Sequence, residues 1–202
     1  NGDKLLIYKE GGDNSGDIFI SQLKGKSWQK AELADPSLAT KTFETGACIS
    51  NDGKKIFFAA NMKGTLGGKD IYMIEMDESK KWGAPVNLGP TVNTKFDEEN
   101  PMLWHDGKTL FFASQGHTSM GGFDIFMTYR PDPVSDWSKP YNIGYPLNTS
   151  IDDLYFTLAA NGRTGYVSAF KNGSLGDLDI WYFSLTEPLV KNAGILYRAS
   201  IL

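Results

Sequence analysis

The sequence predicts an all-β protein folded as a β-propeller with four-stranded antiparallel blades. Three observations support this fold class. One set of motifs recurs about every 54 residues, short apolar runs are joined by Asp-Gly or Asn-Gly turns, and no segment has helical periodicity. Propeller repeats have this length and four strands each, whereas solenoid repeats are mostly shorter and often helical. We therefore expect blades rather than a solenoid.

Three kinds of marker define the repeat. The first is an Asn-Gly or Asp-Gly pair with a basic residue close behind it, the second is an Asp-Ile-aromatic triplet, and the third is a tryptophan. All three keep nearly the same spacing, so we infer one structural unit repeated four times. The markers are Gly53, Gly107 and Gly162 in the turns, Asp17, Asp70, Asp124 and Asp179 in the triplets, and Trp28, Trp82 and Trp137.

The second repeat shows how each unit is divided into strands. Its strands are expected at 43–50, 55–60, 70–76 and 85–89. The Asp-Gly pair between the first two predicts a hairpin, because both residues tolerate the positive φ that a type I′ turn requires. The run 56–60 is apolar at consecutive positions, so both faces of the sheet must be covered. Neighbouring blades would cover them.

The units are expected at about 1–42, 43–95, 96–150 and 151–187, which together form the propeller. The first unit lacks an opening strand and the fourth lacks the Trp-marked closing strand. We therefore expect the ring to be completed by strands or a further blade outside this sequence, or by another chain. Residues 188–202 are expected to form a linker and the first strand of a following domain. Trp104 lies outside the periodic set, and we expect it in the core rather than exposed for binding.

Composition excludes several classes of function. The 202 residues carry a net charge of -4 without a pronounced basic stretch, which argues against a nucleic-acid partner. Cys48 is the only cysteine and there are two histidines, so neither a disulfide framework nor a zinc module is expected. The longest apolar runs fall far short of the roughly 20 residues that span a bilayer. No cofactor is expected.

Several motifs in the middle of the chain resemble those of a known family. These motifs are Asn87-Leu88-Gly89-Pro90, Val92-Asn93-Thr94, Asp97-Glu98-Glu99-Asn100-Pro101, Asp106-Gly107-Lys108-Thr109-Leu110-Phe111-Phe112 and Gly121-Gly122-Phe123-Asp124-Ile125-Phe126. They resemble the WD40-like PD40 repeat that TolB shares, and most of all the propellers of OmpA-family lipoproteins of Bacteroidota. The proline typical of the TolB turn is absent from 50–53 and 103–107.

The resemblance implies a role in the bacterial envelope. In those lipoproteins the propeller is followed by a carboxypeptidase-regulatory-like domain and then by a peptidoglycan-binding domain. Residues 192–198 of this chain resemble the first strand of the carboxypeptidase-regulatory-like domain. One such lipoprotein is the peptidoglycan-anchoring component of the type IX secretion system. The resemblance therefore implies a periplasmic, outer-membrane-associated scaffold that binds other envelope proteins and reaches peptidoglycan only through a separate domain.

One rim of the propeller is the candidate binding site. If the strands alternate in direction, the glycine-rich loops and the connections between units share one rim, which would be acidic and rich in glycine. An alternative is that the acids start strands and cap turns. The repeated aspartates and tryptophans are expected to be structural, because folding needs every blade whereas chemistry needs one site. The candidate partner-binding residues are Glu44, Leu66, Asp97, Glu98, Glu99, Met120, Asp152 and Asp153.

An enzymatic propeller is the main alternative. A sialidase-like glycosidase needs an arginine cluster and an Asp box, and neither is present; a prolyl-oligopeptidase-type propeller needs a hydrolase domain. His105 and His117 lie in no catalytic motif and are expected at the surface. A glycan or peptidoglycan binder would need exposed Trp or Tyr in the central rim. Calcium at 97–99 is disfavoured, because three consecutive acids in an extended chain cannot all face one ion. We therefore expect no catalytic residue and no metal site.

Overall fold

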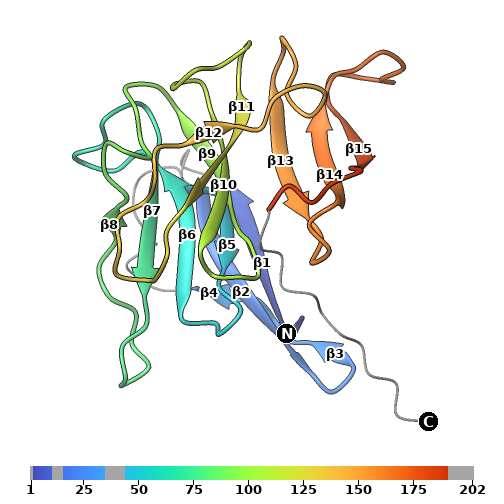
Figure 1. The fold of residues 1–202 in the computed structure, drawn as a ribbon. Coiled ribbons are helices and arrows are strands. Elements are labelled where there is room, and N and C mark those ends of the chain that lie inside the picture. The colour runs from blue at the N-terminus through green and yellow to red at the C-terminus, as the bar shows by residue number, and fades with distance from the viewer. Residues whose placement is uncertain (1, 11–15, 35–43, 191–202) are drawn as a thin grey trace.

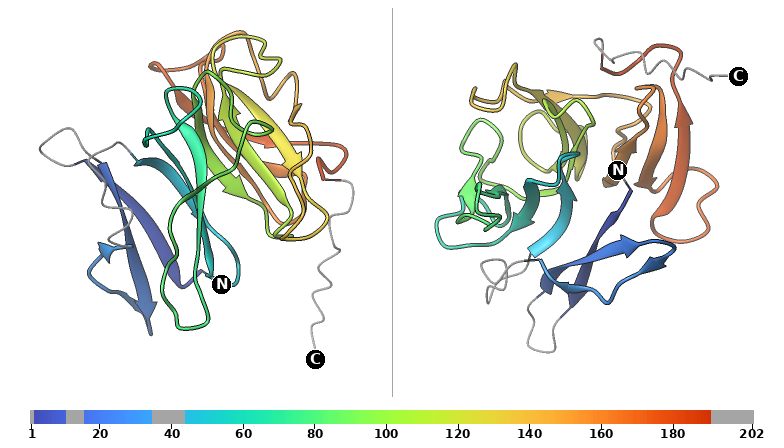
Figure 2. Two further views of the ribbon diagram at one scale, coloured as in Figure 1. Left: turned by 90° about the vertical axis from the view of Figure 1, so that its left-hand side faces the viewer. Right: turned by 90° about the horizontal axis from the view of Figure 1, so that it is seen from below.

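The computed structural model describes residues 2–10, 16–34 and 44–190, and all regular structure in these residues is β-strand (Figure 1). Four antiparallel sheets form the four blades of a β-propeller. Seen from below, the sheets follow one another around a common centre in chain order (Figure 2). The predicted fold class is therefore confirmed.

Each sheet is built from consecutive strands. The first sheet contains β1 (Lys4–Glu10), β2 (Gly16–Lys24), β3 (Ser27–Trp28) and β4 (Glu32–Leu33). The second contains β5 (Glu44–Ile49), β6 (Lys55–Ala60), β7 (Asp70–Glu75) and β8 (Val86–Asn87). The third contains β9 (Glu98–Leu103), β10 (Thr109–Ser114), β11 (Asp124–Tyr129) and β12 (Tyr141–Asn142). The fourth contains β13 (Asp153–Leu158), β14 (Thr164–Ala169) and β15 (Asp179–Ser184).

The first and last sheets differ from the two between them. Among the described residues, the first sheet has no counterpart of the opening strands β5, β9 and β13, and the fourth has no counterpart of the closing strands β8 and β12. Both differences agree with the prediction from sequence. The strand of a following domain was expected within 188–202, and residues 191–202 lie outside the described part of the chain.

The opening strands share a bulge. The pairing with the next strand shifts register at Gly46, Asn100 and Tyr155, and these three residues have φ of 37°, 50° and 50°. A positive φ is unfavourable for a residue with a side chain, least so for asparagine. The same backbone feature therefore recurs at one position of the repeat in spite of three different residue types.

Apolar side chains hold consecutive sheets together. Ile18 of the first sheet packs with Phe58 of the second, and Phe57 of the second packs with Phe112 of the third. A further cluster joins the third and fourth sheets and contains Trp104, which lies in the core as predicted. Burying one such side chain contributes roughly 2 kcal/mol, so these clusters explain why the strands are apolar on both faces.

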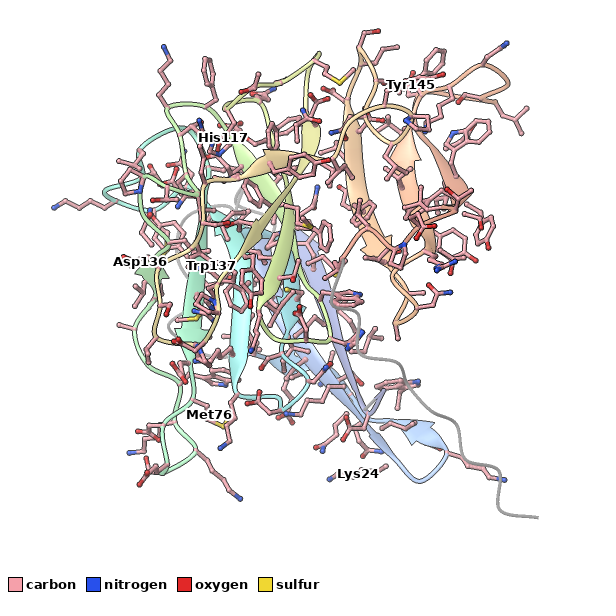
Figure 3. All side chains as sticks on the ribbon, viewed as in Figure 1. Lys24, Met76, His117, Asp136, Trp137 and Tyr145 are labelled. Carbon is pink, nitrogen blue, oxygen red and sulfur yellow. The ribbon has the colours of Figure 1, made fainter. Side chains whose placement is uncertain are left out.

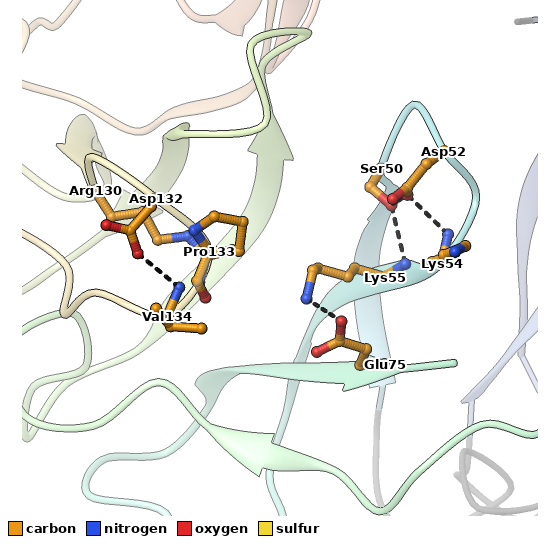
Figure 4. A network of polar contacts seen from close by, with 9 residues as sticks. All are labelled: Ser50, Asp52, Lys54, Lys55, Glu75, Arg130, Asp132, Pro133 and Val134. Carbon is orange, nitrogen blue, oxygen red and sulfur yellow. Dashed lines mark hydrogen bonds and ion pairs between the residues drawn. The ribbon is translucent and has the colours of Figure 1, made fainter. Parts of the chain in front are cut away.

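The hairpin turns differ from the predicted type I′ geometry. In the first such turn only Gly53 has a positive φ, 71°, and its N–H donates to the Ser50 carbonyl at 2.8 Å. The Asp52 carboxylate instead accepts from the Lys54 N–H at 3.0 Å (Figure 4). Asp106 with Lys108 and Asn161 with Arg163 repeat this contact at 2.8 Å and 2.9 Å. The Asp-Gly or Asn-Gly marker therefore corresponds to a turn that the Asp or Asn side chain holds, with only the glycine in the left-handed region.

Close packing runs from each sheet to the next but does not close the ring. β5 packs beside β1 and β2, β9 beside β5 and β6, and β13 beside β9 and β10. Within the described strands, none of the fourth sheet packs extensively against the first. The described part of the chain contains no helix that is long and apolar enough to cross a membrane.

Candidate functional site

The glycine-rich loops and the connections between sheets gather at one end of the molecule, which we call the loop rim. It comprises 61–69, 88–97, 115–123, 143–152 and 170–178. Figure 3 shows His117 and Tyr145 at this end, and Lys24 and Met76 at the opposite end. The sequence predicted that these loops share one rim, and the structure agrees.

The repeated aspartates fix the glycine-rich loops. Asp70 begins β7, is fully buried, and accepts from the N–H groups of Leu66 and Gly67 at 2.8 Å and 3.2 Å. Asp124 accepts from the Met120 N–H, and Asp179 from the Leu175 N–H at 2.6 Å. Each carboxylate thus compensates for loop N–H groups that would otherwise lack a partner. Asp17 lies in β2 opposite Lys9.

A second contact joins each glycine-rich loop to the following sheet. Asp97 accepts from the Lys69 N–H at 3.0 Å, and Asp152 accepts from the Phe123 N–H at 2.8 Å. A Cβ at Gly68 would lie 2.1 Å from an Asp97 carboxylate oxygen, so only glycine allows this approach. Gly122 has the same relation to Asp152. We call this the inter-sheet loop contact.

Glu98 and Asp153 are buried completely, which corrects their assignment to a partner-binding patch. Glu98 accepts from the N–H and hydroxyl groups of Thr94 at 2.8 Å and 2.7 Å, and from the Ser114 hydroxyl at 2.7 Å. Burial raises the pKa of Glu98 against the lowering effect of these hydrogen bonds, and it raises the pKa of Asp153 against hydrogen bonds from Thr149. Because neither carboxylate reaches the surface, neither can contact a partner directly.

The remaining acids of the predicted patch are also engaged within the chain. Asp97 and Asp152 form the inter-sheet loop contact, and Glu99 forms an ion pair with Lys69 at 2.6 Å. The backbone of Glu44 pairs with Ala60 in the second sheet, and its side chain lies outside what the structure describes. The alternative raised from the sequence, that the acids start strands and cap turns, fits these contacts better than an acidic docking patch.

Two asparagines that were not among the predicted site residues or repeat markers tie the connections between sheets to the strands β7 and β11. The buried Asn93 accepts from the Ile71 N–H at 2.7 Å and donates to the Ile71 carbonyl at 3.0 Å. Asn148 makes the same pair of hydrogen bonds with Ile125, each at 2.8 Å. Both residues keep the spacing of the repeat, so adding asparagine to the periodic markers would have found them.

Apolar side chains are exposed at equivalent positions of the rim. Leu66 and Met120 are half exposed and Leu175 is 98% exposed, and each follows a Thr or Ser and precedes the loop glycine. Phe96 and Ile151, which occupy equivalent positions in the connections between sheets, are also exposed. The loop hydrogen bonds to Asp70, Asp124 and Asp179 fix the backbone at the first three residues. The rim therefore exposes apolar side chains at repeated positions, next to exposed polar residues and glycines.

Two pockets of the rim occupy equivalent places between sheets. One, of about 660 Å³, is lined by Leu66, Pro90, Thr94, Lys95, His117 and Lys139 among others. The other, of about 390 Å³, is lined by Tyr145, Pro146, Ser150, Ile151, Phe170 and Asn172 among others. Both are open to solvent, and the first is bordered by two lysines rather than by carboxylates.

His105 and His117 are only partly exposed, although the sequence predicts both at the surface. His117 donates from Nε2 to the Val92 carbonyl at 2.8 Å, because a carbonyl oxygen can only accept. Burial lowers the pKa of His117, which favours the neutral ring at pH 7. His105 packs against Trp104 with the two rings tilted by 49°, and its Nε2 lies 3.2 Å from the Ala160 carbonyl oxygen. Both rings are therefore engaged in packing and hydrogen bonds to backbone carbonyls.

The repeated tryptophans lie in three different environments. Trp137 is buried, packs edge-to-face with Phe57, and has the Arg130 guanidinium 4.3 Å from its ring. Trp82 is partly buried against the core of the second sheet. Trp28, on the short strand β3, is exposed. Trp28 therefore lacks the packing by which Trp82 and Trp137 contribute to the core, although all three were expected to be structural.

Three comparisons with known proteins bear on the fold. No family model matches the sequence, and no curated protein matches it significantly. A TolB of Agrobacterium tumefaciens aligns with a TM-score of 0.57 at 15% identity, over 91% of this chain and 58% of that chain. An α-L-arabinofuranosidase from Lactobacillus brevis aligns with a TM-score of 0.54 at 15% identity, over 91% of this chain and 69% of that chain. The periplasmic gluconolactonase PpgL of Pseudomonas aeruginosa aligns with a TM-score of 0.47 at 13% identity, over 91% of this chain and 54% of that chain.

The chain is therefore an all-β propeller with a fold like that of TolB. It spans 58% of the length of that TolB structure. At these identities the likeness concerns the fold alone. Among the described residues, no group of three or more His, Cys, Asp or Glu side chains is placed to hold a metal ion.

Proposed function

We propose that this propeller is a non-catalytic scaffold that binds a protein partner through the loop rim. The observation that carries the proposal is the exposure of an apolar side chain at the same position of three loops, Leu66, Met120 and Leu175. Buried aspartates and the inter-sheet loop contact hold the loops of Leu66 and Met120, so little conformational entropy is lost when a partner covers these two loops. A few well-packed residues near the centre of an interface carry most of the binding energy.

The finer part of the proposal concerns the setting of the scaffold. We place it in the periplasm, as part of an outer-membrane-associated, peptidoglycan-linked OmpA-family lipoprotein, with the type IX secretion machinery as the source of its partners. The support for this setting is the sequence resemblance of 87–101 and 106–126 to those lipoproteins. Detection of the endogenous protein in the cytoplasm rather than in the envelope of its source cell would refute the setting.

The rim can be tested by substitution of its exposed residues. The double variant Leu66→Ser and Met120→Ser should weaken the complex with a purified partner at least tenfold, because two apolar contacts are lost. The partner would first be isolated from envelope extract on the wild-type chain and identified by mass spectrometry. The control is Val134→Ser, which removes an exposed apolar side chain from the loop after β11, outside the rim. Equal affinities for all three chains would refute the rim as the binding site.

The acidic residues give a second discriminating variant. Asp152→Asn retains a side-chain oxygen that can accept from the Phe123 N–H but removes the charge. If apolar contacts dominate, this variant should bind the partner as the wild type does. A large loss of affinity with unchanged folding would instead favour the acidic docking surface that the sequence predicted.

One observation favours a second candidate function, the binding of a glycan. Tyr145 is mostly exposed beside the smaller pocket, whose lining also includes Thr149, Ser150 and Asn172. An aromatic face with neighbouring hydroxyl and amide groups suits a sugar ring. Titration of peptidoglycan fragments by calorimetry would test this function, with Tyr145→Ala expected to abolish any heat of binding.

The non-catalytic part of the proposal has its own test. Turnover of glycoside or peptide substrates by the purified chain would refute it.

A further inference from the structure

The fourth sheet leaves uncovered the face that the second and third sheets bury. Ile71 and Ile125 are 0% and 1% exposed, whereas Ile180 at the equivalent position of β15 is 79% exposed. Tyr166 and Tyr182, directly opposite each other on β14 and β15, are 52% and 60% exposed. We call these three side chains the end face.

Equivalent positions elsewhere show what the end face is built to contact. Phe57 and Phe111, the counterparts of Tyr166, are completely buried. The sheet that follows each of them in the chain supplies the covering side chains, such as Phe112 over the second sheet and Phe156 over the third. The surface that fits the end face is therefore the apolar face of another blade.

The loop beside the end face shows which kind of blade can fit. A Cβ at Gly67 would lie 1.9 Å from the Phe96 carbonyl oxygen, and at Gly121 it would lie 2.4 Å from the Ser150 carbonyl carbon, but at the equivalent Gly176 it would meet nothing. The next residue, which must be glycine in the inter-sheet loop contact, is Asp177 in the fourth sheet. A blade with an aspartate before its opening strand, as Asp97 precedes β9, would bring that carboxylate against the carboxylate of Asp177. The matching blade therefore lacks an opening strand.

The first sheet has this property, and it has a largely apolar face that no other described sheet covers, with the Lys9 ammonium 4.8 Å from the centre of the Phe19 ring. It contains no described counterpart of the opening strands. Ile7, Phe19 and Leu33 lie side by side on β1, β2 and β4 and are partly exposed, and Leu5 on the same face is about half exposed. The opposite face of this sheet, which contains Ile18, packs against the second sheet. Within one chain, the first sheet makes no extensive contact with the fourth.

We propose that the end face docks the first sheet of a second copy of this chain. Ile180, Tyr166 and Tyr182 of one copy would cover Ile7, Phe19 and Leu33 of the other. Each copy carries both surfaces, so two copies can bury all of them in a closed pair with two identical contacts. This contact lies on a sheet face and is separate from the loop rim, so either proposal can fail while the other stands.

Sedimentation velocity of the 202-residue chain tests the proposal over about 1 to 100 µM, a range that covers ordinary dimer affinities. We expect the mass of two chains at the upper end. Ile180→Asp and Ile7→Asp should each raise the dissociation constant at least tenfold, because each places a charge in an apolar contact. Val86→Asp is the matched control, since Val86 is an exposed aliphatic residue on the strand β8. It should associate as the wild type does.

A mixing experiment tests the direction of the contact. The Ile180→Asp chain has an intact first sheet and the Ile7→Asp chain has an intact end face. An equimolar mixture should therefore associate more tightly than either variant alone, since one of the two contacts is restored. Larger assemblies with the same dependence on Ile180 and Ile7 would also support the docking, with the contact repeated along a chain of copies.

Three results would overturn the proposal. The first is a monomer throughout the concentration range. The second is association that Ile180→Asp leaves unchanged while circular dichroism shows the variant to be folded. The third is a disulfide between cysteines placed at Ile7 and Tyr182 that forms within one chain, since the first sheet would then cover the end face of its own molecule.

Discussion

Asp70, Asp124 and Asp179 begin equivalent strands and accept from the N–H group four residues earlier, yet their surroundings differ. Asp70 is fully buried and also accepts from the Asn87 amide at 2.7 Å. Asp179 is partly exposed, and the one hydrogen bond that the structure shows to its side chain comes from Leu175. The same residue type at one position of the repeat therefore contributes differently to stability, because water can replace a lost partner only at Asp179.

This difference gives a prediction at the residue scale. Asp70→Ala should lower the free energy of unfolding by about 3 kcal/mol, since the Leu66 and Gly67 N–H groups and the Asn87 amide lose their acceptor in a buried site. Asp179→Ala should cost less than about 1 kcal/mol, because its loop is open to water. Urea denaturation of both variants measures the difference. Equal losses would show that burial does not decide the contribution of this aspartate.

At the scale of elements, the glycine-rich loops and the opening strands are coupled across sheets. Gly121 approaches the backbone of Ser150 so closely that no side chain fits, and the Phe123 N–H bonds Asp152 on the same connection. The loop of the third sheet is thereby matched to the start of the fourth. A glycine pair in a loop usually suggests flexibility, but at this position it indicates a tight contact.

Gly121→Ala and Gly176→Ala form a matched pair for this coupling. We expect Gly121→Ala to destabilise the protein by about 2 kcal/mol, because the added Cβ overpacks the contact with Ser150. Gly176→Ala should be close to neutral, since a Cβ there meets no atom within 4 Å. Thermal unfolding monitored by circular dichroism compares the two variants with the wild type. A loss of stability in Gly176→Ala would mean that the fourth loop is covered.

At the scale of the whole molecule, the sheets differ in how many of their faces are covered. The central strands β6 and β10 are apolar on both faces and buried along almost their whole length. The central strand β14 of the fourth sheet alternates between buried and more exposed residues, because only the face toward the third sheet is covered. Local stability should follow this gradient, since it depends on buried apolar contacts.

Amide hydrogen exchange measures this gradient. At a low protein concentration, the amides of β14 should exchange at least tenfold faster than those of β6 and β10, although all three strands are hydrogen-bonded on both sides. The comparison is matched because each is the middle strand of an antiparallel sheet. Equal protection of the three strands would mean that the end face is covered in solution.

The repeat, the fold class and the strand positions of the second repeat follow from the sequence alone. In the second repeat the expected 70–76 and 85–89 enclose β7 (Asp70–Glu75) and β8 (Val86–Asn87). These features are local, because turn residues and apolar runs act over a few neighbouring residues and each is written into every repeat. The same reasoning placed the glycine-rich loops on one rim.

The tertiary structure decided which residues that rim exposes. Glu98 and Leu66 were equal candidates in the sequence, and only packing buries the first against Thr94 and Ser114 and leaves the second exposed. The pairing of Asn93 with Ile71 and the approach of Gly121 to Ser150 join residues more than twenty positions apart. Such contacts depend on how neighbouring sheets pack, which the spacing of the repeat markers does not specify. The uncovered face at Ile180 is therefore a property that only the assembled sheets reveal.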